Sequence, residues 1–314
     1  MPSSLRLFRA EAIKLLRLRL TWVLLVLLIV IQALRVDNIY SHAFDEPPAE
    51  ITPATVLPED YWQAAILPGV FERARLSYDW LSIFAILLTA MTLGQEFTWG
   101  TMRTILARGT GRGRLLMTRF AALVAVIACY LAVLWLACGI LGLLTTQSLE
   151  GGINWGFLSG EFLAKEIAAL ARTWVAIWPS VALALLIAVW TRNPGLSLSL
   201  VELAYGFDFL LATFSGGLLG IYLAYVVEAG LDPRETGIGI WGILVTLIPH
   251  YNITSVIHWG QPGKIAELAN STLFMAEVLD LPRDPWRCLG LLLGYGLVAL
   301  VLAVWTFQRK DVTL

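Results

Sequence analysis

The chain is 314 residues long, and 58% of its residues are hydrophobic while only 14% are charged. A soluble domain carries about a quarter charged residues, so the composition excludes a soluble enzyme as the default class. The net charge of −1 gives no attraction to nucleic acid, and the three cysteines have neither a disulfide framework nor a zinc-binding spacing.

Residues 1–19 form a basic amphipathic stretch ahead of the first apolar run. On a helical wheel, Arg6, Arg9, Lys14 and Arg17 fall within one arc, opposite a cluster of apolar side chains. The pattern predicts an elbow helix that lies along the inner face of the lipid bilayer. A second interpretation is that the stretch only orients the protein. A signal peptide is disfavoured because no small-x-small cleavage site follows.

Six stretches are apolar and long enough to form helices across a bilayer, whose hydrocarbon core of about 30 Å takes around 20 helical residues. The predicted spans are 20–36, 79–95, 118–146, 168–191, 196–227 and 287–308. The sequence therefore predicts an all-α polytopic membrane protein, in which residues 37–78 form an external loop.

The segment 237–250 is apolar but does not fit this count. A seventh span would place Arg309 and Lys310 on the outer side, against the rule that basic residues stay inside. We therefore expect a short re-entrant or interfacial helix that stops near Pro249.

The distribution of basic residues sets the orientation. With both termini in the cytoplasm, thirteen basic residues and three acidic ones, Glu11, Glu96 and Asp311, lie on the inner side. The basic residues are Arg6, Arg9, Lys14, Arg17, Arg19, Arg103, Arg108, Arg112, Arg114, Arg119, Arg192, Arg309 and Lys310. This asymmetry predicts cytoplasmic termini.

The loop at 96–116 follows the second span and is the most distinctive stretch of the sequence. Met102, Ile105 and Leu106 have the spacing of a short amphipathic helix, which the glycines within 109–113 are expected to end. Such a helix can dock in a groove of a cytoplasmic partner. From these residues alone, an ordinary positively charged inner loop is the favoured interpretation.

A resemblance to a known family changes that interpretation. The residues that carry it are Glu96, Gly100, Thr101, Arg103, Leu106 and the basic cluster Arg112 to Arg114. They resemble the pattern that follows the second helix in ABC type-2 permeases, the membrane subunits of many bacterial ATP-binding cassette exporters. The resemblance covers nearly the whole chain, including the elbow, the six spans and the tight turn at 191–194.

In that family the loop is a coupling helix seated on an ATPase subunit. The resemblance therefore implies a coupling role for the matching part of this chain. The residues concerned are Glu96, Gly100, Thr101, Met102, Arg103, Ile105, Leu106, Arg108, Arg112 and Arg114.

The chain has no G-x-x-x-x-G-K-[ST] motif for ATP phosphates, so it is not expected to be an enzyme. ATP and Mg²⁺ are expected on a separate subunit, and no cofactor is expected here. The resemblance implies two ATP-binding subunits, a second permease subunit in a homodimer or heterodimer, and a place in the inner membrane of a bacterium. Each permease would form half of an export path.

Glu202 and Asp208 lie within the predicted fifth span and are candidates for the transport pathway. Residues six positions apart on a helix differ by about 240° in direction, which disfavours a paired-acid centre. A structural role between helices is the favoured interpretation, with Asp208 the better pathway candidate. If both acids were functional, the alternative would be a channel or an ion-coupled transporter.

The three histidines, His42, His250 and His258, have no metal-binding spacing, and solvated or interfacial histidines are the favoured interpretation. An intramembrane enzyme built on them has no nucleophile and base to support it.

Overall fold

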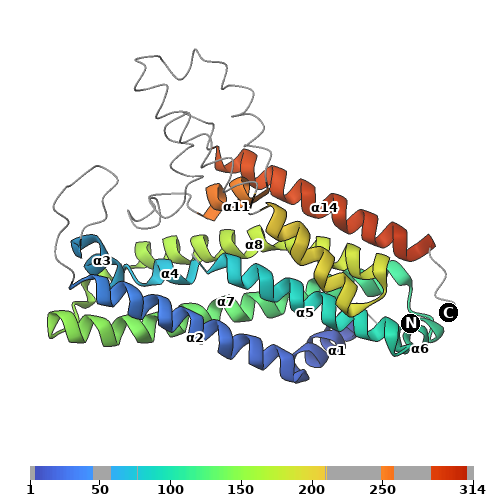
Figure 1. The fold of residues 1–314 in the computed structure, drawn as a ribbon, viewed down its shortest axis with the longest axis horizontal. Coiled ribbons are helices and arrows are strands. Elements are labelled where there is room, and N and C mark those ends of the chain that lie inside the picture. The colour runs from blue at the N-terminus through green and yellow to red at the C-terminus, as the bar shows by residue number, and fades with distance from the viewer. Residues whose placement is uncertain are drawn as a thin grey trace, which may run out of the picture.

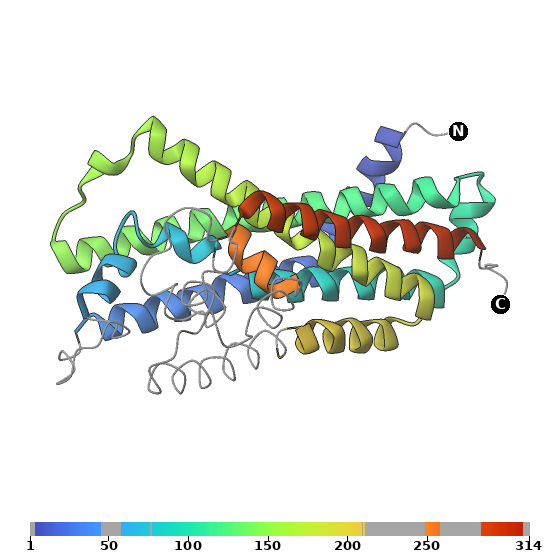
Figure 2. The same ribbon diagram turned by 90° about the horizontal axis from the view of Figure 1, so that it is seen from above.

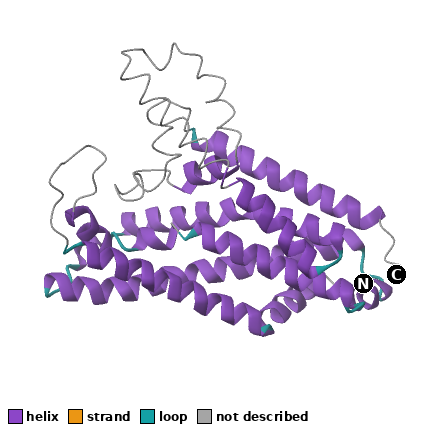
Figure 3. Cartoon of the chain, in the orientation of Figure 1, coloured by secondary structure: helices purple, strands orange, loops and turns teal. Residues whose placement is uncertain are grey.

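The computed structural model describes residues 4–44, 58–75, 77–208, 210, 249–257 and 284–309, and this part of the chain contains helices but no strand (Figure 3). One helix, at residues 194–208, has no label in Figure 1. The other helices, in chain order, are α1 (Ser4–Arg17), α2 (Arg19–His42), α3 (Pro58–Ala65), α4 (Phe71–Arg75), α5 (Tyr78–Thr98), α6 (Thr101–Ala107), α7 (Arg112–Glu150), the 3₁₀ turn Trp155–Phe157, α8 (Gly160–Thr191), α11 (Pro249–Ile257) and α14 (Pro285–Arg309).

Five helical stretches among the described residues are long and apolar enough to cross a membrane. They are α2, the segment Phe71–Thr98 that ends in α5, α7, α8 and α14. The sixth predicted span, 196–227, is described only near its start, where it is helical, and the rest lies outside the described residues.

The long helices run side by side along the long axis of the molecule (Figure 1). The end of the bundle that holds α6 also holds the end of α14 (Figures 1 and 2). We call it the inner end, after the orientation expected from the sequence.

Several helices extend beyond the stretches predicted to lie in the membrane. α2 continues to His42, α7 runs from Arg112 to Glu150, and α8 begins at Gly160. At 1.5 Å per residue, the 39 residues of α7 span about 58 Å, well beyond the hydrocarbon core. Hydropathy marks only the part of a helix that meets lipid, so the polar ends were not visible as helix.

Backbone geometry explains where two of these helices stop. α7 ends at Gly151, whose φ of +69° suits a residue without a Cβ atom. α8 begins where the Ser159 hydroxyl accepts a hydrogen bond from the Phe162 amide at 3.2 Å, and it ends at Arg192 in the left-handed conformation.

The segment expected to be an external loop is partly helical and packed. α3 and α4 follow α2, and α4 lies against α7, where Phe71 stacks on Trp135 with ring centroids 4.7 Å apart. Thr146 of α7 accepts a hydrogen bond from the Leu67 amide at 2.9 Å. Residues 37–78 contain many prolines and charges, so a search for apolar runs does not detect these short helices.

A helix also begins at the proline where the sequence predicted one to stop. α11 starts at Pro249 and runs to Ile257, and proline is well tolerated in the first turn of a helix. Most of the predicted segment 237–250 lies outside the described residues.

The core lies between α5, α7, α8 and α14. Leu81, Leu88, Leu134 and Leu185 are among its buried side chains. α14 approaches α8 closely at Gly296, where an added Cβ would lie 3.4 Å from the Cα atom of Pro179. Close side-chain packing therefore joins these four helices.

Candidate functional site

The turn between α5 and α6 depends on a glycine. Gly100 has φ of +69° and caps α6, and its amide donates a hydrogen bond to the carbonyl oxygen of Phe97 at 3.2 Å. The Thr101 hydroxyl donates to the carbonyl oxygen of Glu96 at 3.2 Å. Only a residue that tolerates the left-handed region fits here without strain, so the sequence Gly100-Thr101 specifies this corner.

α6 has one buried face and one exposed face. Met102 is 1% exposed and belongs to the main core, and the half-buried Ile105 and Leu106 pack against the same core. On the other side, Arg103 and Arg108 are exposed. The apolar face predicted for this helix therefore binds it to its own bundle, and the two arginines lie on its exposed face.

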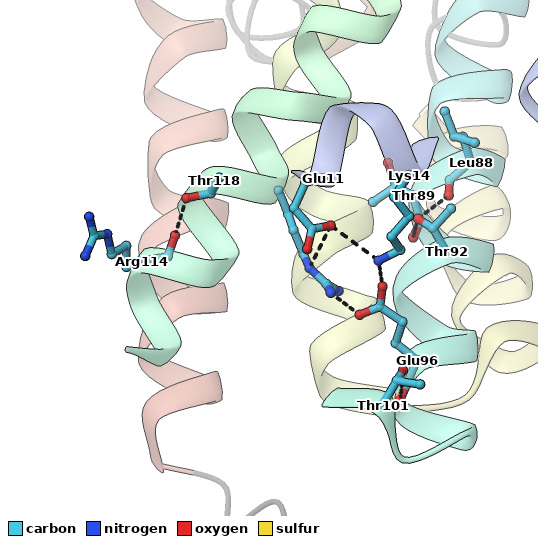
Figure 4. Close-up of polar contacts among 10 residues, drawn as sticks. Glu11, Lys14, Leu88, Thr89, Thr92, Glu96, Thr101, Arg114 and Thr118 are labelled. Atoms are coloured by element: carbon cyan, nitrogen blue, oxygen red, sulfur yellow. Dashed lines mark hydrogen bonds and ion pairs between the residues drawn. The ribbon is translucent and has the colours of Figure 1, made fainter. Parts of the chain in front are cut away.

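Four charged side chains meet at the junction of α1, α5 and α7 (Figure 4). Glu96 of α5 forms ion pairs with Lys14 of α1 and with Arg119 of α7. Glu11 of α1 completes the group, with its carboxylate 3.3 Å from the Lys14 ammonium and 3.6 Å from Arg119 Nε. We call these four residues the charge cluster.

The charge cluster is electrically balanced and largely removed from water. Glu96 is 6% exposed, and Glu11 and Arg119 are also buried. Burial and the nearby Arg119 lower the pKa of Lys14, whereas Glu11 raises it. A void of about 10 Å³ lies beside the cluster, close to the volume that one water molecule needs. Two acids and two bases in contact offset the cost of burying each charge.

Two arginines of α7 tie other chain segments to the same end of the bundle. Arg112 donates a hydrogen bond to the carbonyl oxygen of Gln308 at 2.8 Å, which holds the end of α14. Arg114 donates to the hydroxyl of Ser4 at 3.0 and 2.7 Å, which holds the start of α1. Both side chains are therefore engaged within the chain.

The turn after α8 packs closely against α5. An added Cβ at Gly94 would lie 2.5 Å from the Cα atom of Pro194. The Arg192 guanidinium lies 5.9 Å from the ring centroid of Phe97. The inner end of α5 therefore contacts the turn that leads to the next helix.

The predicted coupling residues thus fall into three groups. Arg103 and Arg108 are exposed, whereas Glu96, Met102, Ile105 and Leu106 are buried or half-buried. The remaining residues shape the turn or hold neighbouring helices; they are Gly100, Thr101, Arg112 and Arg114. Sequence reasoning missed Glu11, Lys14 and Arg119 as partners of Glu96. A lone acid in a basic helix, and an arginine inside an apolar run, were the signals available.

Glu202 and Asp208 lie outside the charge cluster. Both are half-buried on the helix 194–208. On the same helix, the Tyr205 hydroxyl donates a hydrogen bond to Asp79 Oδ1 of α5 at 3.1 Å. Among the described residues, no group of three His, Cys, Asp or Glu side chains is arranged to hold a metal ion.

Five long apolar helices among the described residues indicate a multi-pass membrane protein. A family profile described as ABC-2 family transporter protein matches residues 5–312. The chain therefore belongs to the ABC-2 family and is a permease component of an ABC transporter, a type of subunit that associates with an ATP-binding subunit. No curated protein sequence matches the chain significantly.

Proposed function

We propose that this chain is the membrane subunit of an ABC exporter and that α6 receives force from a separate ATP-binding subunit. The observation that carries the proposal is that one face of α6 is buried and the other face is exposed. Its apolar face is anchored in the bundle while Arg103 and Arg108 face outward. A helix bound firmly on one side and exposed on the other can pass a push from a partner to the helices behind it.

The charge cluster extends this mechanism from α6 to the elbow. When the partner moves α6, Glu96 at the end of α5 carries the displacement to Lys14 of α1 and Arg119 of α7. The three helices then tilt as one body, because separating them would leave buried charges without partners. Rigid-body tilting of this kind would open a path between two permease subunits.

The assembly we propose contains two permease chains, identical or different, and two ATP-binding subunits that hold ATP and Mg²⁺. Both termini face the cytoplasm, α1 lies along the inner surface of the cell membrane, and no nucleic acid takes part. The excess of basic residues at the end that carries α6 supports this orientation. A channel or ion-coupled transporter that uses Asp208 and Glu202 would instead move its substrate along an ion gradient and ignore ATP.

A charge reversal on the open face of α6 tests the proposal. The double variant R103E/R108E, coexpressed with the partner ATP-binding subunit, is expected to lose most co-purification while its unfolding temperature stays at the wild-type value. The matched control is R287E, an exposed arginine of α14. Undiminished co-purification and transport in R103E/R108E would contradict the coupling role of α6.

A further inference from the structure

An arginine is buried in the bundle, in the short helix α4, without the partners that such a group needs. Arg73 is 7% exposed, and within the described part of the chain its Nε and Nη2 atoms have no hydrogen-bond partner. α4 packs against α2 and α7. Arg119 of the charge cluster forms ion pairs with Glu11 and Glu96, whereas Arg73 forms no such ion pair with a described residue.

The side chains around Arg73 supply further unused donors. Gln32 of α2 is 1% exposed, and its Nε2 atom also has no hydrogen-bond partner among the described residues. Ser77 links the two: its hydroxyl donates to Gln32 Oε1 and contacts the carbonyl oxygen of Arg73 at 2.9 Å. Cys138 of α7, fully buried, lies beside both side chains.

Charges of both signs lie near Arg73. Arg35 lies one turn after Gln32 on α2 and acts electrostatically on Arg73, as does the acidic Glu72 next to it in sequence. Glu72 offsets part of the charge, but Nε and Nη2 of Arg73 have no hydrogen-bond acceptor among the described residues. Two nitrogens of Arg73 and one of Gln32 are therefore buried donors without a hydrogen-bond partner among the described residues, and Ser77 contacts both residues.

The group lies at membrane depth, in the outer half. Gln32 is thirteen residues along α2 from Arg19, which corresponds to about 20 Å of the roughly 30 Å hydrocarbon core. Water is scarce there, and a buried guanidinium whose N–H groups lack acceptors is costly. An anionic group with several acceptor oxygens is the chemistry that matches a guanidinium and an amide.

We propose that Arg73 and Gln32 form a binding site for the anionic head group of an amphiphile that lies in the outer half of the membrane. A phosphate or carboxylate on a lipid-like molecule supplies the acceptors that the chain lacks and brings an apolar tail that fits the surroundings. The site is independent of ATP and of the coupling role of α6.

Native mass spectrometry of the full-length chain tests this site with phosphatidylglycerol and phosphatidylcholine as probes. The wild type is expected to bind the anionic lipid about tenfold or more tightly than the zwitterionic one, the scale of a charge-assisted hydrogen bond. R73Q is expected to lose that preference. R287Q removes one exposed positive charge near the outer end of α14 and is expected to keep it.

Thermal unfolding provides a second test, in which the wild type and R73M are expected to respond differently to the anionic lipid. In nanodiscs of phosphatidylcholine alone, R73M is expected to unfold at or above the wild-type temperature, because it removes a buried charge. Addition of phosphatidylglycerol is expected to stabilise the wild type and not R73M. Excess inorganic phosphate is expected to stabilise neither, and equal stabilisation of the wild type by free phosphate would overturn the assignment to an amphiphile.

The opposite orientation of the Gln32 amide would satisfy Arg73 within the chain. If the Gln32 amide were turned over, its oxygen would accept from Arg73 and its nitrogen would donate to Ser77. R73M would then lose stability equally in both lipids, and R73Q would keep the wild-type lipid preference. Either result overturns the proposal.

Discussion

Glu96, in the last turn of α5, forms an ion pair with Lys14 of the N-terminal helix α1, 82 positions earlier in the chain. The loop that follows the second span is thereby joined to the elbow helix inside one chain. Arg119 of α7 binds the same carboxylate, so the three helices meet at a single buried group. These ion pairs connect α1, α5 and α7 at the inner end of the bundle.

Neutralising Glu96 is expected to destabilise the protein. E96Q leaves Lys14 and Arg119 with one acid between them, and an uncompensated buried charge costs about 3–5 kcal/mol. The unfolding temperature of the purified chain, followed by tryptophan fluorescence, is expected to fall accordingly. E161Q, which breaks an exposed pair with Lys165, is the control and is expected to cause no measurable change.

The double variant K14M/E96Q separates loss of charge balance from loss of side-chain volume. It removes one charge of each sign and leaves Glu11 paired with Arg119. Its unfolding temperature is expected to recover part of the loss seen in E96Q. Equal or greater destabilisation would show that the cluster is not held together by charge balance.

Gly100 is expected to tolerate substitution poorly because of its backbone alone. No atom lies within 4 Å of an added Cβ, so the cost of G100A comes from φ of +69° and amounts to about 1–2 kcal/mol. G290A, inside α14 with equally open space and no positive φ, is the control and is expected to be neutral or stabilising. Chemical denaturation of both variants measures the difference; similar losses would contradict the explanation.

Gly94 is expected to be limited by contact and not by backbone conformation. In G94A the new methyl group meets the backbone of Pro194, which forces α5 away from the turn after α8 and costs about 1–3 kcal/mol. G294A, in α14 with open space around it, is expected to be neutral or stabilising, because alanine favours a helix. Thermal unfolding distinguishes the two; a harmless G94A would mean that this contact is loose.

Local patterns in the sequence predict much of this architecture and little of its internal contacts. The apolar runs predict where helices meet lipid, and the family inferred from Glu96, Gly100, Thr101 and Arg103 is confirmed by the match over residues 5–312. The spacing of Met102, Ile105 and Leu106 predicts the short helix that the structure contains as α6. These features depend on neighbours in sequence.

Contacts between distant residues were not visible in the same way. Glu96 looked like a residue that faces a partner, because nothing in the sequence shows that Lys14 and Arg119 reach it. Arg73 belonged to a proline-rich, charged stretch, and only packing of α4 against α7 shows that it is buried. Three-dimensional packing, which brings residues from separate helices together, decided both cases.

Site-specific photo-crosslinking tests the central claim most directly, because it reports which surface touches the ATP-binding subunit. A photoreactive residue at Arg103 on α6 is expected to form an adduct with that subunit in cells. The same residue at Trp155, which is exposed in the 3₁₀ turn that follows the far end of α7, is expected to form none. An adduct at Trp155 and none at Arg103 would contradict the account.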